Sequence, residues 1–455
     1  RLQGEVHRRS RASTRCLRRH SAELKATMSS LPYCVVGAGP AGLAVARWLK
    51  ALDLPFEGFE RNPGVGGIWN IAFPESPMYE SAHFISSRTL SGFRDFPMPD
   101  SYPDYPSHRQ ILQYIESYAD KFDLRPHFKF TTPIEHAEPM TDGTWTVRFK
   151  DGSTRSYAGL IAASGCEWRP NLPTLAGTFD GEIIHSSAYK HPRQFEGRRV
   201  LVVGAGNSGC DIACDASRSA TKALISLRRG YHFVPKHIFG QPADVFGDSG
   251  PHLPYVIERP LFQGLLRLLN GNTARLGLPK PDHSILESHP VMNTQILHAL
   301  AHGDIETRAD VKELRGGEVA FVDGRSDPVD LIVLATGYVR GVPFVSPEIV
   351  GDDDVSALFL NVFHRTSPNL FVIGNFTTDA GAYPLVDRQG EMVARVLDAR
   401  RGGRSLSHFE AVLNGKSPDL GGGIRYQSVR RMSNYVKSRP YRRYLDALLS
   451  SLRTD

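Results

Sequence analysis

Two glycine runs with the same spacing carry the strongest chemical signal in this 455-residue sequence: Gly37-Ala-Gly39-Pro-Ala-Gly42 and Gly204-Ala-Gly206-Asn-Ser-Gly209. Each run follows a short apolar segment and precedes a stretch in which apolar residues recur at helical spacing. A strand, a G-x-G-x-x-G turn and a helix form a dinucleotide-binding fingerprint, because the glycines permit a tight turn and let a pyrophosphate approach the helix N-terminus. One such unit takes about 30 residues. The two runs lie much farther apart, so we predict two separate nucleotide sites.

The residues at the ends of the next strands distinguish the two sites. After the first run, the strand expected over 55–59 is followed by Glu60, whose carboxylate can accept both hydroxyls of an unphosphorylated ribose. After the second run, the strand expected over 223–227 is followed by Arg228 and Arg229, with no acid. Two guanidinium groups suit a 2′-phosphate, which a carboxylate would repel. We therefore assign FAD to the first site and NADPH to the second; a solvated surface charge is the alternative for the arginine pair.

Further strands and a late helix are expected to position loops around these sites. Residues 131–150 alternate polar and apolar side chains around an Asp-Gly pair, which predicts a β-hairpin. The apolar segments 160–163 and 331–334 end in small residues, and both are expected to return to the first sheet. Near the C-terminus, the strand over 370–373 leads to a helix from about Asp387, whose N-terminus would favour negative charge on a flavin ring.

Composition places the chain among globular proteins of two or three domains. Hydrophobic residues make up 41% and charged residues 22%, and no apolar run approaches the roughly 18–20 residues that span a bilayer. The formal net charge is +6, and residues 1–27 account for all of it with seven Arg, one Lys and two Glu. The remainder is neutral, so no nucleic-acid partner is expected.

The Arg-rich segment 1–27 has no apolar periodicity and precedes Met28. We expect a disordered extension or a start site placed too far upstream, and a mitochondrial-type presequence is the alternative. The C-terminal stretch 441–455 is short and charged, so no membrane anchor is expected there. The amphipathic stretch 261–269 predicts a helix that packs between domains; a substrate entrance or the face of a homodimer is the alternative.

The cysteines exclude two classes of site. The five residues form no C-x-x-C pair: Cys16, Cys34, Cys166, Cys210 and Cys214. Neither a disulfide framework nor a zinc site is therefore expected, and we expect no metal at all. A reducing, cytoplasmic location fits this usage.

The segment between the two glycine runs resembles a known family. Phe179-Asp-Gly-Glu-Ile-Ile-His-Ser-Ser-Ala-Tyr189 matches the F-x-G-x-x-x-H-x-x-x-Y/F signature of flavin-containing monooxygenases and, as in that family, stands just before the second run. The chain is also similar to the family in four further places: Glu60–Trp69, Asp95–Pro99, Ala335–Tyr338 and the pattern Gly374…Pro384…Gln389. The likeness covers about residues 31–400.

This resemblance implies an α/β fold with two Rossmann-like dinucleotide-binding domains, the NADPH domain inserted into the FAD domain. After the extension over 1–27, the first part of the FAD domain is expected over 28–168. The NADPH domain is expected over 169–330, and the second part of the FAD domain, with C-terminal helices, over 331–455.

The expected binding residues follow from the glycine runs and the family pattern. FAD is expected to contact Gly37, Gly39, Pro40, Ala41, Gly42, Glu60, Gly67, Trp69, Thr336, Gly337, Gly374 and Gln389. NADPH is expected to contact Gly204, Gly206, Asn207, Ser208, Gly209, Arg228 and Arg229. The Gly-rich turn that ends in Trp69 suits a flat cofactor; an ordinary turn with a core Trp is the alternative.

By resemblance, NADPH reduces FAD by hydride transfer, the reduced flavin forms a C4a-hydroperoxide with O₂, and one oxygen atom passes to a soft nucleophile, an amine or sulfide on a small molecule. Family relatives that run Baeyer–Villiger oxidations of ketones carry a Trp followed by Pro or Asp at the end of the signature. Tyr189-Lys190 favours the N- and S-oxidising branch here, and the Baeyer–Villiger branch stays the alternative.

One position departs from the family. Many members carry an Asn near the flavin where this chain has Ile85. Ser86 and Ser87 are the candidate replacements, and His185 is a third candidate catalytic side chain, although we expect a structural role for it first. An FAD- and NADPH-binding oxidase or sensor without oxygenation is therefore kept as an alternative. A flavoprotein disulfide reductase would need a redox cysteine pair that this spacing does not supply.

Overall fold

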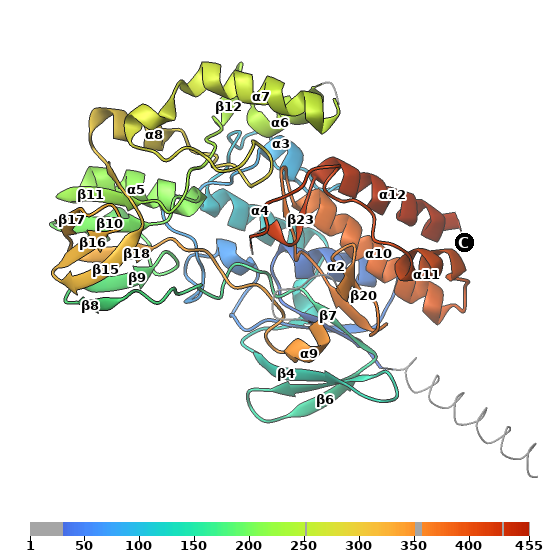
Figure 1. Ribbon diagram of the computed structural model, residues 1–455. Helices are drawn as coiled ribbons and strands as arrows, with labels where there is room; N and C mark the ends of the chain where they lie inside the picture. Colours follow the sequence, from blue (N-terminus) through green and yellow to red (C-terminus); the bar gives the residue numbers. More distant parts are fainter. Residues whose placement is uncertain (1–30, 251–252, 351–356, 430–431, 455) are drawn as a thin grey trace, which may run out of the picture.

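Two mainly parallel sheets form the frame of the protein, each packed between helices on one face and a smaller sheet on the other (Figure 1). The computed structural model describes residues 31–250, 253–350, 357–429 and 432–454. The expectation for residues 1–27 lies outside the described residues. The frame confirms the predicted α/β class with two dinucleotide-binding folds.

The first sheet has seven strands in the order β19 (Leu358–Phe359), β20 (Phe363–His364), β21 (Leu370–Val372), β7 (Gly159–Ala162), β1 (Tyr33–Val36), β2 (Phe56–Phe59) and β3 (Phe128–Lys129). From β21 to β3 all neighbours are parallel. Because the side chains of a strand alternate between faces, Val35 packs on the helical side, and Cys34 and Val36 pack on the other.

Three helices cover one face of the first sheet: α2 (Pro40–Ala51), α4 (His108–Lys121) and α10 (Tyr383–Arg401). The other face packs against β4 (Ile134–Pro139), β5 (Trp145–Phe149) and β6 (Thr154–Tyr157). Strands β4 and β5 are antiparallel around Gly143, which confirms the predicted hairpin. Helix α10 begins at Tyr383, with Pro384 in its first turn, four residues before the expected start, since proline is well tolerated at that end of a helix.

The second sheet has five parallel strands in the order β14 (Glu306–Arg308), β11 (Lys222–Ser226), β10 (Arg199–Val203), β18 (Leu331–Leu334) and β9 (Glu182–His185). Helices α5 (Asn207–Ser219) and α8 (Gln295–His302) cover one face. The other face packs against β17 (Ser326–Pro328), β16 (Glu318–Phe321), β15 (Val311–Gly316) and β8 (Gly177–Phe179). The two halves of the molecule therefore repeat one architecture.

The expected place of the segment 331–334 was wrong. Strand β18 pairs in parallel with β10 on one side and β9 on the other, so it belongs to the second sheet. The companion segment 160–163 pairs with β1, as expected. A fully buried apolar run predicts a central parallel strand but not the sheet it joins. The chain returns to the first half only after this strand.

The remaining elements surround the frame: α3 (Arg88–Ser91), α6 (Ala243–Ser249), α7 (Tyr255–Asn270), α9 (Pro347–Val350), α11 (Ser407–Asn414), α12 (Ser438–Thr454), β12 (His237–Ile238), β13 (Gln241–Pro242), β22 (Thr377–Thr378) and β23 (Tyr435–Val436). In the part of the chain that the structure describes, no helix combines the length and the apolar character needed to cross a bilayer.

Helix α7 lies at the top of Figure 1 and contains the predicted amphipathic stretch. Leu266 is buried in a small cluster with Val234 and Ile238. Leu261 and Leu268 are 61% and 79% exposed. The packing prediction therefore holds for one side of the helix and is wrong for the other.

Candidate active site

A large cavity lies where strands β1 and β10 end, and both glycine runs line it. Its volume is about 1510 Å³, larger than the roughly 300–1,000 Å³ of ordinary small-molecule pockets. Ligands of parallel α/β sheets bind outside the carboxyl ends of the strands. The cavity thus joins the two predicted nucleotide sites in one space.

The first glycine run forms a cradle that side chains would fill. Gly37 has φ +107°, and a Cβ atom there would lie 2.6 Å from the Ala163 carbonyl oxygen. A Cβ atom at Gly42 would lie 1.8 Å from the Gly37 oxygen, so helix α2 can sit this close to the strand only with glycine. Gly39 is the N-cap of α2 and supplies no side-chain cap. The first N–H groups of the helix therefore face the cavity, as an anion site requires.

Glu60 is held at the edge of this cradle. Its carboxylate accepts hydrogen bonds from the Ala38 N–H at 2.7 Å and from the backbone and side-chain nitrogens of Asn62 at 2.9 and 3.0 Å. The side chain is 7% exposed and lines the cavity. The carboxylate oxygens retain further acceptor capacity for ribose hydroxyls.

The Gly-rich turn approaches the cradle from the other side. A Cβ atom at Gly67, which has φ +56°, would lie 3.0 Å from the Gly39 Cα. Trp69 follows on the same turn, is 9% exposed and meets Phe84 with ring centroids 5.1 Å apart. Pro40, Ala41, Gly67 and Trp69 all line the cavity, which places the predicted flat-cofactor turn beside the predicted phosphate site.

The second glycine run repeats the geometry of the first. Gly204 has φ +103°, and its Cβ would lie 2.6 Å from the Ala335 oxygen; a Cβ at Gly209 would lie 2.0 Å from the Gly204 oxygen. Gly206 caps α5 without a side-chain hydrogen bond. Ser208 and Asn207 line the cavity, and the Asn207 Oδ1 accepts the Met292 N–H at 2.7 Å.

The arginine pair lies at the end of β11 and lines the same cavity. Arg229 donates to the Gln427 Oε1 at 3.0 Å. Arg228 is exposed and has no hydrogen bond or ion pair with any residue that the structure describes. The Arg228 guanidinium is therefore available for an anion, next to an Arg229 that is held by a hydrogen bond.

The residues expected from the far end of the family pattern divide into two groups. Thr336, Gly337 and Gly374 line the cavity. Gln389 does not: it is fully buried, its Oε1 accepts the Gly374 N–H at 2.9 Å, and its Nε2 donates to the Tyr441 hydroxyl at 2.7 Å. Gln389 thus supports the Gly374 turn from the core, and its expected contact with FAD stays a prediction.

The candidate catalytic serines lie in different places. Ser86 lines the cavity, and its Oγ accepts from the Ser91 Oγ at 2.9 Å. Ser87 is fully buried as the N-cap of α3, where its Oγ accepts the Leu90 N–H. Ser87 is thus a cap and not a cavity residue. Ile85, in the position of the family Asn, lines the cavity with 38% of its surface exposed.

His185 holds two segments together. Its Nε2 donates to the Gly337 carbonyl at 3.0 Å, and its Nδ1 accepts the Ser187 N–H at 3.1 Å, which is the pattern of a neutral ring. Burial lowers the pKa of His185, and the hydrogen bond to the Gly337 carbonyl opposes that shift. His185 is not among the residues that line the cavity. Its geometry is that of a positioning residue.

The end of the family signature connects the two halves of the molecule. The Tyr189 hydroxyl donates to the Asp215 Oδ2 of α5 at 2.9 Å, and the Ser81 hydroxyl donates to the same oxygen. Lys190 donates from Nζ to the carbonyl oxygens of Ser76 and Met78. Tyr189 and Lys190 thus fix the 76–81 segment, part of which lines the cavity.

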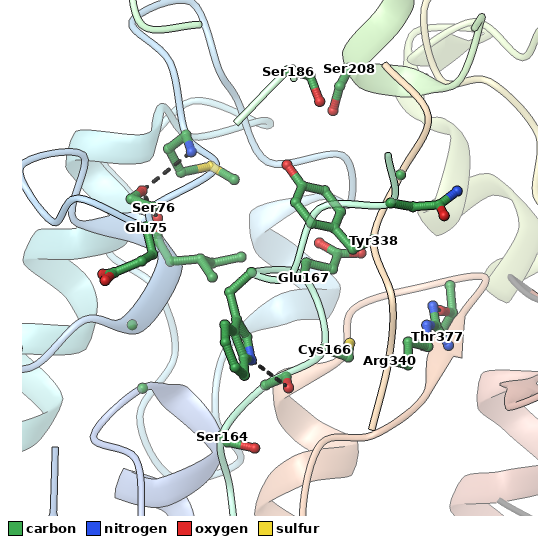
Figure 2. Close-up of a pocket in the computed structure, with 18 of the residues that line it drawn as sticks. Glu75, Ser76, Ser164, Cys166, Glu167, Ser186, Ser208, Tyr338, Arg340 and Thr377 are labelled. Atoms are coloured by element: carbon green, nitrogen blue, oxygen red, sulfur yellow. Dashed lines mark hydrogen bonds between the residues drawn. The ribbon is translucent and has the colours of Figure 1, made fainter. Parts of the chain in front are cut away.

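Several cavity residues were not predicted from the sequence. Figure 2 shows Cys166 close to Arg340 and Thr377, with Glu167 and Tyr338 above them, and all five line the cavity. Cys166 and Glu167 follow β7, and Arg340 follows β18. The small residues that end these two strands were the available signal, since the chain just beyond them enters the cavity. In the described residues no three His, Cys, Asp or Glu side chains gather where they could hold a metal ion.

Comparison with known proteins gives relatives along most of the chain. The model of the flavin-binding monooxygenase-like family matches residues 32–448. The chain is 34% identical over 325 residues to the probable indole-3-pyruvate monooxygenase YUCCA9 of Arabidopsis thaliana, covering 68% of this chain and 75% of that protein. It is 32% identical over 388 residues to dimethylaniline monooxygenase (N-oxide-forming) 2 of Rattus norvegicus, covering 80% and 72%.

A solved structure supports the fold. A cyclohexanone monooxygenase from Rhodococcus sp. Phi1, bound to NADP⁺, superimposes with a TM-score of 0.70 at 20% identity over 92% of this chain and 97% of that chain. At this identity the likeness concerns the fold alone. The family match, with relatives above 30% identity, shows that the chain belongs to the flavin-binding monooxygenase-like family, a family of oxidoreductase enzymes.

Proposed function

We propose that this protein is an FAD- and NADPH-dependent monooxygenase that transfers one oxygen atom from O₂ to an amine or sulfide of a small molecule. The carrying observation is that two glycine cradles with unlike ribose-end residues, Glu60 and the pair Arg228–Arg229, line one cavity. An acid at one end and two arginines at the other suit two different dinucleotides.

The first cradle suits FAD. Gly37 and Gly39 leave the N-terminus of α2 open for a pyrophosphate, and the buried carboxylate of Glu60 is placed for ribose hydroxyls. Trp69 and Tyr383 supply apolar surface for a ring system farther along the same cavity. When bound, FAD would take a hydride from NADPH and activate O₂.

The second cradle suits NADPH. Gly204 and Gly206 leave the N-terminus of α5 open, and Arg228 and Arg229 supply positive charge for a 2′-phosphate. With a thioether substrate, the overall reaction converts thioether, O₂, NADPH and H⁺ into sulfoxide, NADP⁺ and water.

The protein's own contribution is positioning and exclusion of water. The four described cysteines are free, with Cys34, Cys210 and Cys214 buried. These cysteines give no support to a disulfide reductase. Ile85 brings an apolar side chain to the place of the family Asn.

The decisive test measures NADPH consumption by the purified holoenzyme with amines, sulfides and ketones, together with oxygenated product and hydrogen peroxide. We expect amine or sulfide oxide in proportion to NADPH consumed. Stoichiometric peroxide without product would instead indicate an oxidase, and an absence of turnover would indicate a sensor. Ester or lactone from a ketone would establish the Baeyer–Villiger alternative.

Two further expectations stay predictions. Light scattering of the purified protein tests the homodimer, for which the exposed side of α7 offers apolar surface. Fractionation of cells tests the cytoplasmic location.

A further inference from the structure

One positive charge in the cavity wall has no counter-charge. Arg340 is 9% exposed and lines the cavity. Its Nη2 donates to the Thr377 Oγ1 at 2.5 Å, and its Nη1 is buried without a hydrogen-bond partner. Within the described ranges no carboxylate lies within ion-pair distance of this guanidinium. Figure 2 shows Arg340 beside Thr377, close to Cys166.

Burial of the Arg340 guanidinium without a counter-charge destabilises the protein unless a bound ligand supplies the opposite charge. A buried guanidinium that loses water needs hydrogen bonds and an opposite charge, because an uncompensated buried cation destabilises the fold by several kcal/mol. The backbone fixes this one in place: the Arg169 guanidinium donates to the Arg340 carbonyl at 3.0 Å, and the Val339 N–H donates to the Arg169 carbonyl at 2.8 Å. The side chain is therefore held at the cavity wall.

The anionic groups of the two cofactors would have other partners. The N-termini of α2 and α5 would hold the pyrophosphates, and Arg228 and Arg229 would hold the 2′-phosphate. Arg340 belongs to neither cradle. It lies on the connection that follows β18, against the β22 segment that begins at Thr377. The remaining ligand of the cavity is the small-molecule substrate.

We propose that Arg340, supported by Thr377, binds a carboxylate of the substrate, so that the protein prefers soft nucleophiles that carry an acidic group over neutral ones. This inference rests on the proposed monooxygenase function and narrows its substrate class. A guanidinium matches the planar fork of a carboxylate and binds it with charge-assisted hydrogen bonds.

The test compares 3-(methylthio)propanoate with its methyl ester, two probes that share the thioether and differ in charge. Binding to the oxidised holoenzyme is followed by the change in flavin absorbance without NADPH. We expect the wild type to bind the acid more tightly than the ester. Arg340→Met should weaken binding of the acid by roughly 10- to 100-fold and leave the ester unchanged. Arg340→Lys, which keeps the charge, should retain part of the preference.

Two controls keep the outcome specific. FAD content and thermal midpoint show whether Arg340→Met is folded and carries FAD. If it does not, the inference is tested by Arg340→Lys and by the preference of the wild type for the acid over the ester. Arg228→Met should weaken NADPH binding and leave the acid-to-ester ratio unchanged.

Three results would overturn the inference. The first is that the wild type binds the two probes equally or binds neither. The second is that Arg340→Met loses affinity equally for both probes. The third is a change confined to the flavin spectrum and to NADPH affinity, which would mean that Arg340 binds a cofactor. If the acid binds through Arg340 but neither probe is oxygenated, the proposed monooxygenase function fails while the carboxylate site stands.

Discussion

At the scale of single residues, the two nucleotide cradles are alike in backbone and different in charge. A Cβ atom placed on Gly37 or on Gly204 would lie 2.6 Å from a backbone carbonyl oxygen in both cases. The chemistry that distinguishes the sites therefore comes from Glu60 at one and from Arg228 and Arg229 at the other. The roles of these side chains can be tested without disturbing the cradles.

Replacing Arg228 and Arg229 by Ala, singly and together, should raise KM for NADPH and leave KM for NADH unchanged. Each lost charge-assisted contact is worth about 1.5–3 kcal/mol, roughly 10- to 100-fold in affinity. Steady-state kinetics with both coenzymes measure the ratio. Arg325→Ala is the matched control, since Arg325 is exposed and, among the described residues, its side chain pairs with Asp323 alone. An unchanged coenzyme preference in the double variant would make the pair a solvated surface charge.

Glu60→Gln should weaken FAD retention at least about tenfold, because the new amide N–H₂ would face N–H donors that now point at a carboxylate. FAD content after dialysis gives the dissociation constant. Glu57→Gln is the control on β2, the strand just before Glu60; its half-buried carboxylate accepts from Lys129 and the Tyr157 hydroxyl. Equal FAD loss in both variants would contradict a specific role for Glu60.

His185 predicts a pH dependence of stability. Burial lowers the pKa of His185 in the folded state, so the unfolded chain takes up a proton first as the pH falls below about 6.5. The contribution of His185 to stability is then complete above that pH and is lost as the pH falls toward the folded-state pKa. His185→Gln should destabilise the protein by about 1–2 kcal/mol at pH 8, and the gap to the wild type should shrink at pH 5.5. Urea unfolding at both pH values measures this gap; a constant gap would mean that folding does not lower the pKa of His185.

At the scale of elements, the helices that follow the glycine runs can take their places only because the fingerprint glycines carry no side chain. Gly42→Ala pushes a methyl group toward the Gly37 oxygen, 1.8 Å from the ideal Cβ position. We expect a loss of about 1–3 kcal/mol or more and a loss of bound FAD. Thermal unfolding and FAD content measure both effects.

The matched control is Gly264→Ala. Gly264 also lies inside a helix, α7, but its Cβ would meet nothing within 4 Å. This variant should be neutral or more stable by up to about 1 kcal/mol. A Gly42→Ala protein as stable and as yellow as the control would show that α2 can shift without harm to the cradle.

Sequence pattern was sufficient for the local units and insufficient for their partners. The glycine runs, their flanking strands and the β4–β5 hairpin follow from spacing and composition, because each is set by residues close in the chain. The prediction assigned strand β18 to the wrong sheet, since its apolar residues suit any buried parallel strand. The places of Gln389 and Arg340 also depend on long-range packing. Gln389 is buried behind the Gly374 turn, and Arg340 lies at the cavity wall.

At the scale of the whole molecule, the cavity is useful only if the two halves keep their relative position. Asp215 on α5 is 4% exposed and accepts hydrogen bonds from Tyr189 and from Ser81. The segment that holds Ser81 continues toward α4, where the His108 N–H donates to the Ala82 carbonyl at 3.0 Å. The carboxylate thus ties the helix of the second cradle to a helix that packs on the first sheet.

Asp215→Asn should therefore slow the reduction of bound FAD by NADPH more than it weakens either cofactor. The amide retains the shape but loses the charge-assisted acceptor, a change of about 1–3 kcal/mol at a buried site, and hydride transfer tolerates little misplacement of its partners. Stopped-flow reduction by NADPH measures the effect, and reduction by dithionite, which needs no second cradle, is the internal control. Tyr189→Phe should give a smaller change in the same direction, since Ser81 still bonds the carboxylate. Equal slowing by both reductants would place the defect in the flavin site alone, and unchanged rates would mean that the two halves hold their positions without Asp215.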